Sequence, residues 1–394
     1  MTLPTIDEAL ALVLAEVPFL GAEEVPVAAA AGRVLAEDAR AVVDLPPFAS
    51  SAMDGYAVRA ADTPGRLRLV GHSAAGAPAA RGLGAGEAIG ISTGAVVPEG
   101  ADAVVPVEVT ELDGDVVEVG AVVRMENVRP RGGDVGAGDV VVERGALLGP
   151  PQLGALAAVG LASVACGRRP RVAVLPTGSE LRPPGEALGP GEIYESNSTL
   201  LAAQLRSAGA DPVVLAPVAD AEAATREALA AGLRHDVLVS SGGVSMGEHD
   251  LVRRTLGELG SREVFWRVAV KPGKPVSFGV AGATLVFGLP GNPVSSLVAF
   301  ELFVRPALRL LQGAASPGPR FRPGLLARSV RRDEGRDQLL RARSRLDAGA
   351  VALEPLTGQE SHMIGRAASA DALVLVPRGE GELASGSPVA YLEL

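Results

Sequence analysis

The spacing of apolar positions predicts a helical start and then a strand-rich stretch. Apolar residues recur with helical spacing over 6–17, and Thr5-Ile6-Asp7-Glu8 is a capping box, so a first helix is expected there. From about residue 41 to 142, short Val-rich runs alternate with Gly, Pro and Asp-Gly turns. Leu112-Asp113-Gly114-Asp115 lies between two such runs and predicts a β-hairpin. We therefore expect a β-rich lobe inserted into a mostly helical N-terminal region, which resumes as a helix at 152–165.

Beyond Arg168-Arg169-Pro170 the pattern changes to apolar strands that alternate with amphipathic helices. Strands are expected at 172–175, 212–218, 237–240, 264–270 and 284–287, and helices at 198–208, 221–233, 250–259 and 293–311. This alternation predicts a doubly wound, mostly parallel sheet with helices on both faces. Ligands of such sheets bind outside the carboxyl ends of the strands.

A linker, AASPGP at 314–319, separates this α/β unit from short strand patterns at 325–394. The predicted fold class is therefore α/β multidomain with a small all-β C-terminal domain. We place the N-terminal region at 1–168 with its lobe at about 41–142, the central α/β domain at 169–315 and the C-terminal domain at 319–394.

Charge and composition exclude several classes of protein. The chain has 36 basic and 46 acidic residues, a net charge of −10, which argues against a general nucleic-acid binder. A single cysteine excludes a disulfide scaffold and fits a reducing cytoplasm. The N-terminus lacks the basic region of a signal peptide, and the longest apolar run, 153–166, is shorter than the ~20 residues that span a bilayer. We expect a cytoplasmic protein that does not bind membranes.

The distribution of lysine is unusual. The only two lysines among the 36 basic residues are Lys271 and Lys274, both in the pentapeptide KPGKP. An ammonium group is a compact point charge, unlike the planar guanidinium of arginine, so the chemistry of this loop favours a role for both lysines. The alternative is chance placement on a solvated turn.

Four loops leave the predicted strand ends of the central domain, and each has anion-binding character. The first three contain Thr177, Gly178 and Ser179; Ser241, Gly242, Gly243 and Ser245; and Pro290, Gly291 and Asn292, and the fourth is KPGKP. Successive Gly and Ser residues let backbone N–H groups converge on a phosphate. Asn292 and the proline after it also suit the start of a helix. Four such loops at one sheet edge predict a phosphorylated ligand.

Carboxylates accompany these loops and have two interpretations. Glu180, Asp220, Glu248 and Asp250 lie on or beside them. They either cap or compensate helix starts or hold Mg²⁺ against a bound phosphate. In the lobe, Asp54 lies within SSAMDGYA and Thr93 within ISTGA. The residues of these two segments are also typical of simple turns between strands, so their sequence alone does not assign them a function.

Seven motifs occur in one order along the chain: SSAMDGYA, ISTGAVVPEGADAVVPVE, NVRPRGGD, PTGSEL, SSGGVSMGEHD, KPGKP and GLPGNPVS. Together they closely resemble the MoeA family, molybdopterin molybdenumtransferases related to the gephyrin E domain. The resemblance implies a central molybdopterin-binding α/β fold, an inserted β lobe and a C-terminal β-barrel. It implies an enzyme that takes adenylylated molybdopterin and molybdate and releases AMP and the molybdenum cofactor with Mg²⁺.

The resemblance also implies roles for individual residues. The implied catalytic residues are Asp54, Thr93, Glu180, Asp220, Asp250, Lys271 and Lys274, with Arg129 and Asp134 added to the substrate-binding loops. Mg²⁺ would be held by Glu180, Asp220 and Asp250. Molybdate would be held by Lys271, Lys274, Arg341 and Ser361, where Arg336 and Arg343 compete with Arg341.

The lobe residues Asp54 and Thr93 are implied to reach the cleft of a partner subunit, so a homodimer with composite active sites is expected. A molybdopterin adenylyltransferase is a further expected partner. Two alternative functions remain open: an adenylyltransferase acting one step earlier, and a non-catalytic scaffold. Adenylyltransferases lack the lobe and the C-terminal domain that this sequence predicts, which argues against the first alternative. A scaffold would need a fused module or a long linker, which argues against the second.

Overall fold

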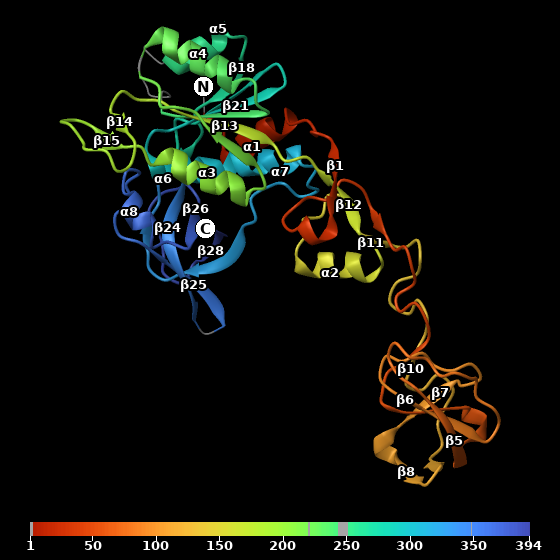
Figure 1. The fold of residues 1–394 in the computed structure, drawn as a ribbon. Coiled ribbons are helices and arrows are strands. Elements are labelled where there is room, and N and C mark those ends of the chain that lie inside the picture. The colour runs from red at the N-terminus through yellow and green to blue at the C-terminus, as the bar shows by residue number, and fades with distance from the viewer. Residues whose placement is uncertain (1–2, 220, 243–250, 348) are drawn as a thin grey trace.

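The computed structural model describes residues 3–219, 221–242, 251–347 and 349–394. They form a central domain, an N-terminal region, a protruding lobe and a C-terminal barrel (Figure 1). Four expected site residues, Asp220, Gly243, Ser245 and Asp250, lie outside the described residues, as does Glu248. Among the described residues, no helix has the length and apolar character that crossing a membrane requires.

The central domain is built on a six-stranded sheet of order β16-β13-β17-β21-β20-β18. Its parallel part consists of β16 (Asp211–Val214), β13 (Arg171–Pro176), β17 (Val237–Ser241) and β21 (Thr284–Leu289). β20 (Ser277–Ala281) and β18 (Arg262–Trp266) continue the sheet in antiparallel pairing. β17 and β21 are buried throughout, as the continuous apolar runs of a covered parallel sheet predict.

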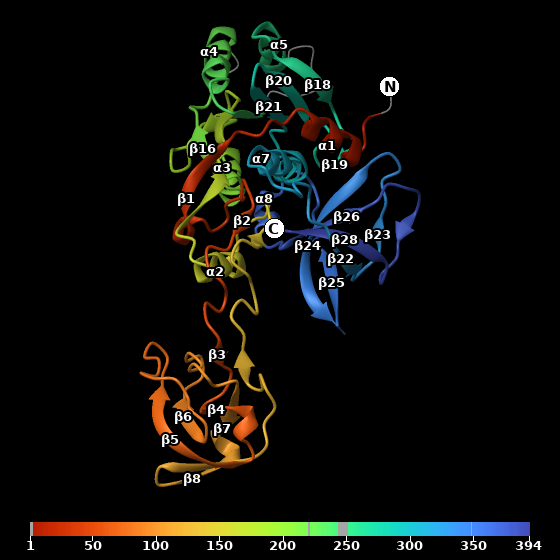
Figure 2. The same ribbon diagram turned by 90° about the vertical axis from the view of Figure 1, so that its right-hand side faces the viewer.

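Helices cover both faces of this sheet (Figures 1 and 2). One face carries α3 (Asn197–Ser207) and a long helical stretch of α6 (Pro293–Ala299), a π-helix (Phe300–Val304) and α7 (Arg305–Leu311). α4 (Glu222–Gly232) and α5 (Leu251–Glu258) pack on the other face. α1 (Ile6–Ala15) has the expected capping box, and Ile6, Ala9 and Val13 join the core of the first face. The first helix of the chain thus packs into the central domain.

The rest of the N-terminal region contains more strand than the sequence pattern predicts. α2 (Pro150–Ala158) ends early, and Gly160 follows with φ +88°, a left-handed conformation that favours glycine. β12 (Ser163–Gly167) then pairs with β1 (Ala22–Pro26), so residues 163–165 are strand and not helix. β2 (Ala39–Arg40) pairs with β11 (Val140–Val142) at the entrance to the lobe, and a short 3₁₀ turn spans Val27–Ala29.

The lobe is a separate six-stranded sheet of order β7-β4-β6-β5-β9-β8. Its strands are β4 (Gly55–Val58), β5 (Gly65–Ser73), β6 (Glu87–Ile91), β7 (Ala103–Pro106), β8 (Thr110–Asp113) and β9 (Val116–Val119), with 3₁₀ turns at Ala60–Asp62 and Val107–Val109. β8 and β9 confirm the predicted hairpin, with Gly114 at φ +65° in its turn. β3 (Ser50–Ser51) pairs with β10 (Val128–Arg129) where the chain enters and leaves. Both views show the lobe standing apart from the central domain, on the segments that connect β2 to β3 and β10 to β11.

The C-terminal domain is a closed five-stranded barrel. β24 (Asp337–Asp347), β25 (Ala350–Pro355), β22 (Arg322–Leu326), β28 (Pro388–Glu393) and β26 (Ala372–Val376) follow one another, and β24 also pairs with β26. β19 (Val270–Lys271), which comes from the central domain, adds to β24 in parallel. Shorter elements are β23 (Val330–Arg331), β27 (Glu382–Leu383) and α8 (Ile364–Ala367), and β14 (Leu181–Arg182) with β15 (Ile193–Tyr194) in the central domain.

Candidate functional site

The carboxyl ends of three parallel strands converge as predicted. The Thr177 N–H, directly after β13, donates to the carbonyl of Ser241 at 3.0 Å, and the Gly242 N–H donates to the carbonyl of Leu289 at 3.1 Å. Gly242 has φ +92°, and a Cβ there would lie 2.6 Å from the Thr177 carbonyl oxygen. Only glycine lets these loops approach so closely.

Asn197, the first residue of α3, ties two of these loops together. Its Nδ2 donates to Ser241 Oγ at 2.7 Å and to the Gly291 carbonyl at 2.8 Å, and the residue is 8% exposed. Asn197 is not among the site residues that the sequence motifs predict. The available signal was the polar run Glu195-Ser196-Asn197-Ser198, which stands where an α/β fold begins a helix beside its ligand edge.

We expect Asn197→Ala to destabilise the central domain by about 2 kcal/mol, because Ser241 Oγ and the Gly291 carbonyl both lose a buried donor. The measurement is urea unfolding followed by the fluorescence of Trp266, the only tryptophan, which lies in β18. Asn127→Ala is the matched control, since Asn127 donates to the Val104 carbonyl within the lobe. An Asn197→Ala transition that coincides with the wild-type one would contradict the expectation.

The loop after β13 brings a carboxylate to the same edge. Gly178 has φ +147°, and a Cβ there would lie 2.5 Å from Oε2 of Glu180, so the exposed Glu180 side chain folds back over this glycine. Ser179 between them is exposed. Glu180 is the one expected Mg²⁺ ligand among the described residues, within which no group of three or more His, Cys, Asp or Glu side chains is arranged to hold a metal.

The loop after β21 reaches the barrel. Asn292 occupies the N-cap position of α6, but its side chain does not cap the helix. Its Nδ2 instead donates to Ser361 Oγ at 2.9 Å, and the Val294 N–H donates to the Ser361 carbonyl at 3.1 Å. Two hydrogen bonds therefore join the barrel loop that carries Ser361 to this strand end, beside the buried Pro290 and the exposed Gly291.

The two lysines have different surroundings. Lys271 in β19 is exposed, with its Nζ 3.7 Å from Oδ2 of Asp333. Asp333 also pairs with Arg336 at 2.8 Å, so one carboxylate serves two cations. Lys274 is partly buried, and within the described ranges its ammonium has no hydrogen-bond or ion-pair partner. Lys274 is therefore the cation of this loop that is available to a bound anion.

The pKa of Asp333 is lowered. Burial alone would raise it, but the hydrogen bonds from Arg336 and the Gly335 N–H and the charges of Arg336 and Lys271 outweigh that effect. A carboxyl group whose pKa falls on folding stabilises the folded state above its unfolded pKa, and this contribution disappears as the pH falls through the folded pKa.

We therefore expect Asp333→Asn to lower the free energy of unfolding by about 1 kcal/mol at neutral pH, because Lys271 and Arg336 lose their shared partner. The difference from wild type should shrink as the pH falls below the ordinary carboxyl value of 3.8. Denaturant titrations of both proteins over this pH range provide the measurement. Asp347→Asn is the control, because Asp347 and its partner Arg345 are both exposed. A difference that does not change with pH would contradict the argument.

Arg341 is almost completely buried, at 1% exposure. Its Nη1 donates to the Met363 carbonyl at 2.6 Å, and its Nη2 donates to the carbonyls of Gly358 and Glu360 at 2.8 and 3.2 Å. Burial lowers the pKa of this guanidinium, against an opposing effect of Glu360. Arg341 thus holds the loop on which Ser361 lies, and its contact with an oxyanion remains a prediction. Of its competitors, Arg336 shares Asp333 with Lys271, while Arg343 is exposed and donates to the Ser369 carbonyl.

The expected lobe residues form a second group. The Thr93 N–H donates to Oδ1 of Asp54 at 2.6 Å, and both side chains are exposed. Arg129 and Asp134 are exposed on the segment that leads back from the lobe. Because the lobe stands apart in both views, this group does not join the strand-end loops within one chain.

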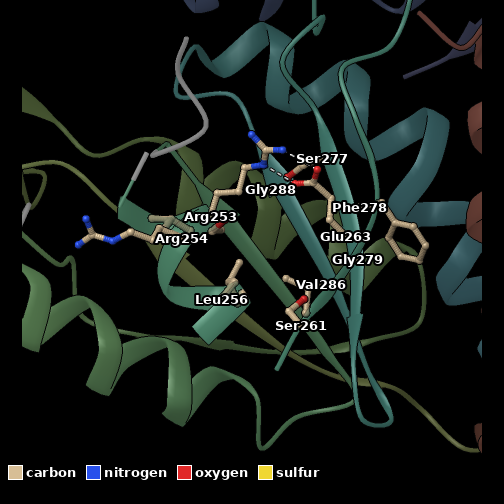
Figure 3. A pocket seen from close by; sticks show the side chains of 13 residues that line it. Arg253, Arg254, Leu256, Ser261, Glu263, Ser277, Phe278, Gly279, Val286 and Gly288 are labelled. Carbon is tan, nitrogen blue, oxygen red and sulfur yellow. Dashed lines mark hydrogen bonds and ion pairs between the residues drawn. The ribbon is translucent and has the colours of Figure 1, made fainter. Parts of the chain in front are cut away.

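A cavity of about 540 Å³ lies on the α5 face of the sheet, beside the end of β17 (Figure 3). Ser240, Ser277 and Gly288 line it from neighbouring strands, and across it Arg253 Nη2 donates to Glu263 Oε1 at 2.6 Å. Ser240 is fully buried, and its Oγ has no hydrogen-bond partner among the described residues. The cavity has the size of a small-molecule site.

Three family models together match nearly the whole chain. Residues 4–160 match the MoeA N-terminal region (domain I and II), 173–310 a probable molybdopterin binding domain, and 323–394 the MoeA C-terminal region (domain IV). The chain belongs to the MoeA family. This confirms the resemblance that the seven motifs indicate.

Relatives of this MoeA chain extend over its full length. A protein of Mycobacterium tuberculosis named molybdopterin molybdenumtransferase 2 is 39% identical over 94% of each chain. A molybdopterin molybdenumtransferase of Haemophilus influenzae is 35% identical over 98% of this chain and 97% of its own. The crystal structure of a molybdopterin biosynthesis MoeA protein from Pyrococcus horikosii has a TM-score of 0.82 and 33% identity, covering 100% and 99% of the two chains.

Proposed function

We propose that this MoeA protein is a molybdopterin molybdenumtransferase that takes adenylylated molybdopterin and molybdate and releases AMP and the molybdenum cofactor. The observation that carries the proposal is the meeting of three elements. The strand-end loops tied by Asn197 adjoin the KPGKP loop and the barrel loop of Ser361 through Asn292 and β19. Backbone N–H groups of the loops, the Lys274 ammonium and the Ser361 hydroxyl therefore lie at one edge of the sheet, where they would bind a phosphate and an oxyanion.

The organic substrate would bind at the strand ends. The Thr177 and Gly242 N–H groups are already bonded to the Ser241 and Leu289 carbonyls. Backbone N–H groups of the loop at Gly291 and Asn292 would therefore hold phosphate oxygens, as Gly-rich loops at strand ends do. The cavity that Ser240 lines would accept a ring.

Molybdate would bind between the central domain and the barrel. It is a tetrahedral dianion, and the Lys274 ammonium, the Lys271 ammonium and the Ser361 hydroxyl are suitable donors to it. A guanidinium, from Arg341 after a shift of the loop at 358–363 or from Arg336, would complete the set. These groups would hold the oxyanion next to the sulfur atoms that receive molybdenum.

Mg²⁺ would be held by Glu180, with Asp220 and Asp250 as further ligands. One exposed carboxylate at the phosphate-binding edge fits the usual Mg²⁺ site, in which one or two protein carboxylates share the ion with substrate phosphates. When bound, the ion would neutralise charge on the phosphoanhydride.

A second copy of the chain would complete each active site. Asp54 and Thr93 form an exposed pair on a lobe that stands apart from its own central domain, so a partner's cleft is the natural place for them. We further propose that a molybdopterin adenylyltransferase supplies the substrate. The single cysteine, Cys166, is unpaired and buried, which supports the proposed cytoplasmic location.

The test is the release of AMP from adenylylated molybdopterin by purified protein with and without molybdate. Molybdate and Mg²⁺ should both be required, and a chelator should abolish release until Mg²⁺ is restored. Release of AMP that is independent of molybdate would contradict the proposal. Formation of adenylylated molybdopterin from molybdopterin and ATP would instead identify an adenylyltransferase.

A further inference from the structure

A second cavity, of about 520 Å³, lies between the central domain and the barrel and shares no lining residue with the site proposed above. Its lining residues come from α3, α6, the π-helix, α7, β22 and β28 and from positions 319, 320 and 394. Figure 1 shows where α3, α6, α7 and β28 lie in the fold. It lies within the range of volumes of small-molecule sites.

Four arginines line this cavity, and two of them have no acidic partner. Arg305 pairs with Glu301, and Arg322 pairs with Glu393, each at 2.6 Å. Arg309 and Arg320 form no ion pair with any described residue, and the Arg309 guanidinium donates to the Gly318 carbonyl at 3.4 Å.

The charges around Arg309 agree with the excess of arginines over acidic partners in this cavity. Burial lowers the pKa of Arg309, and the nearby charges of Arg305 and Arg320 lower it further, against a smaller opposing effect of Glu301. Arg309 and Arg320 therefore line the cavity without an ion-pair partner among the described residues, and an oxyanion would accept bidentate hydrogen bonds from their guanidinium groups.

Gln204 lines the cavity and carries a buried acceptor without a partner in the described part of the chain. Its Nε2 donates to Glu301 Oε1 at 2.7 Å and to the Leu297 carbonyl at 3.3 Å. Both partners are acceptors, so the orientation of the amide is fixed. The residue is 9% exposed, and its Oε1 has no hydrogen-bond partner among the described residues. Buried acceptors are normally paired. This oxygen lies beneath the cavity surface, so it would accept from a ligand hydroxyl only after a small shift of the side chains that cover it.

The helix that carries these groups is itself irregular. The π-helix at Phe300–Val304 contains Glu301, and Arg305 and Arg309 follow at intervals of four residues, so all three line the cavity from one helix. Such π-helical turns are rare, and they occur frequently at functional sites.

We propose that this cavity binds a small organic phosphate that carries hydroxyl groups. Arg309 and Arg320 hold the phosphate, Gln204 Oε1 accepts from a hydroxyl, and Leu297, Pro319 and Leu392 contact the carbon skeleton. Because Arg309 belongs to the central domain and Leu392 to the barrel, the ligand bridges the two domains.

Calorimetric titration of the full chain with ribose 5-phosphate, inorganic phosphate and ribose tests this. We expect saturable binding of ribose 5-phosphate, weaker binding of phosphate and none of ribose. Arg320→Gln, at an exposed position, and Arg309→Gln/Arg320→Gln should each weaken ribose 5-phosphate binding, the double variant by at least about tenfold. Gln204→Met removes the acceptor for the ligand hydroxyl, so the affinities for ribose 5-phosphate and inorganic phosphate should become more similar.

Two controls separate this site from other anion sites. Arg234→Gln changes an exposed arginine without an ion pair among the described residues and should bind as wild type does. Lys271→Gln/Lys274→Gln should retain ribose 5-phosphate binding, whatever its effect on turnover. The proposal is overturned if wild type does not bind ribose 5-phosphate, if Arg320→Gln and the double variant bind it unchanged, or if only the lysine variant loses it.

Discussion

Lys274→Arg should lower molybdate-dependent turnover by about 10²-fold without changing the fold or the net charge. Removal of one well-placed donor to an oxyanion has an effect of this size. The Lys274 ammonium has no partner in the described part of the chain, and the wider, planar guanidinium would not occupy the same point. Lys271→Arg should also weaken molybdate use, although a guanidinium there can keep the pair with Asp333.

Rates of AMP release measured over a range of molybdate concentrations would test both lysine variants. Arg234→Lys is the matched control, because it makes the reverse exchange at an exposed turn after α4 and should leave these rates unchanged. An unaltered dependence on molybdate in Lys271→Arg and Lys274→Arg would show that the loop does not require ammonium groups.

Mixing Asp54→Ala chains with Lys274→Ala chains should restore activity that neither variant has alone. In the proposed homodimer each cleft takes Asp54 from one chain and Lys274 from the other, so a mixed dimer has one intact cleft and one with both changes. Random exchange makes half of the dimers mixed, which predicts about a quarter of wild-type activity.

This experiment needs evidence that subunits exchange, for example from differently tagged chains that are purified together. Lys271→Ala mixed with Lys274→Ala is the control. Both residues belong to the KPGKP loop, so each cleft of a mixed dimer has one altered lysine and no intact cleft can form. If Asp54→Ala and Lys274→Ala exchange subunits without recovery, the two residues serve the cleft of the same chain.

The parallel strands of the central domain follow from the sequence because each is a continuous apolar run between helical patterns. The antiparallel edge of the sheet, β20 and β18, does not follow from the sequence in this way. The predicted strand at 264–270 is divided, since β18 stops at Trp266 and Arg267 has φ +76°. The sequence does not indicate that a residue such as arginine will adopt a left-handed conformation, so the break at Arg267 could not be predicted. β20, Ser277–Ala281, was not predicted, because it is short and contains a glycine.

The loops of the candidate site follow from local sequence, whereas the contacts between them do not. Gly242 and Gly291 are recognisable as turn residues wherever they lie. That Asn197 joins their loops, through Ser241 and Gly291, depends on how α3 packs against the strand ends. That Asp333 joins Lys271 to Arg336 depends on the pairing of β19 with β24. The burial of Arg341 likewise arises from a barrel loop seventeen to twenty-two residues further along the chain.

Because β19 pairs with the barrel, the two lysines are held by different domains. Lys271 lies opposite Gln338 of β24 and moves with the barrel. Lys274 is three residues later, and its carbonyl accepts from the Val268 N–H of the central domain at 3.1 Å, so it moves with that domain. Any rotation of one domain against the other therefore changes the spacing of the two ammonium groups. The width of the proposed oxyanion site would therefore depend on the angle between the two domains and not on either domain alone.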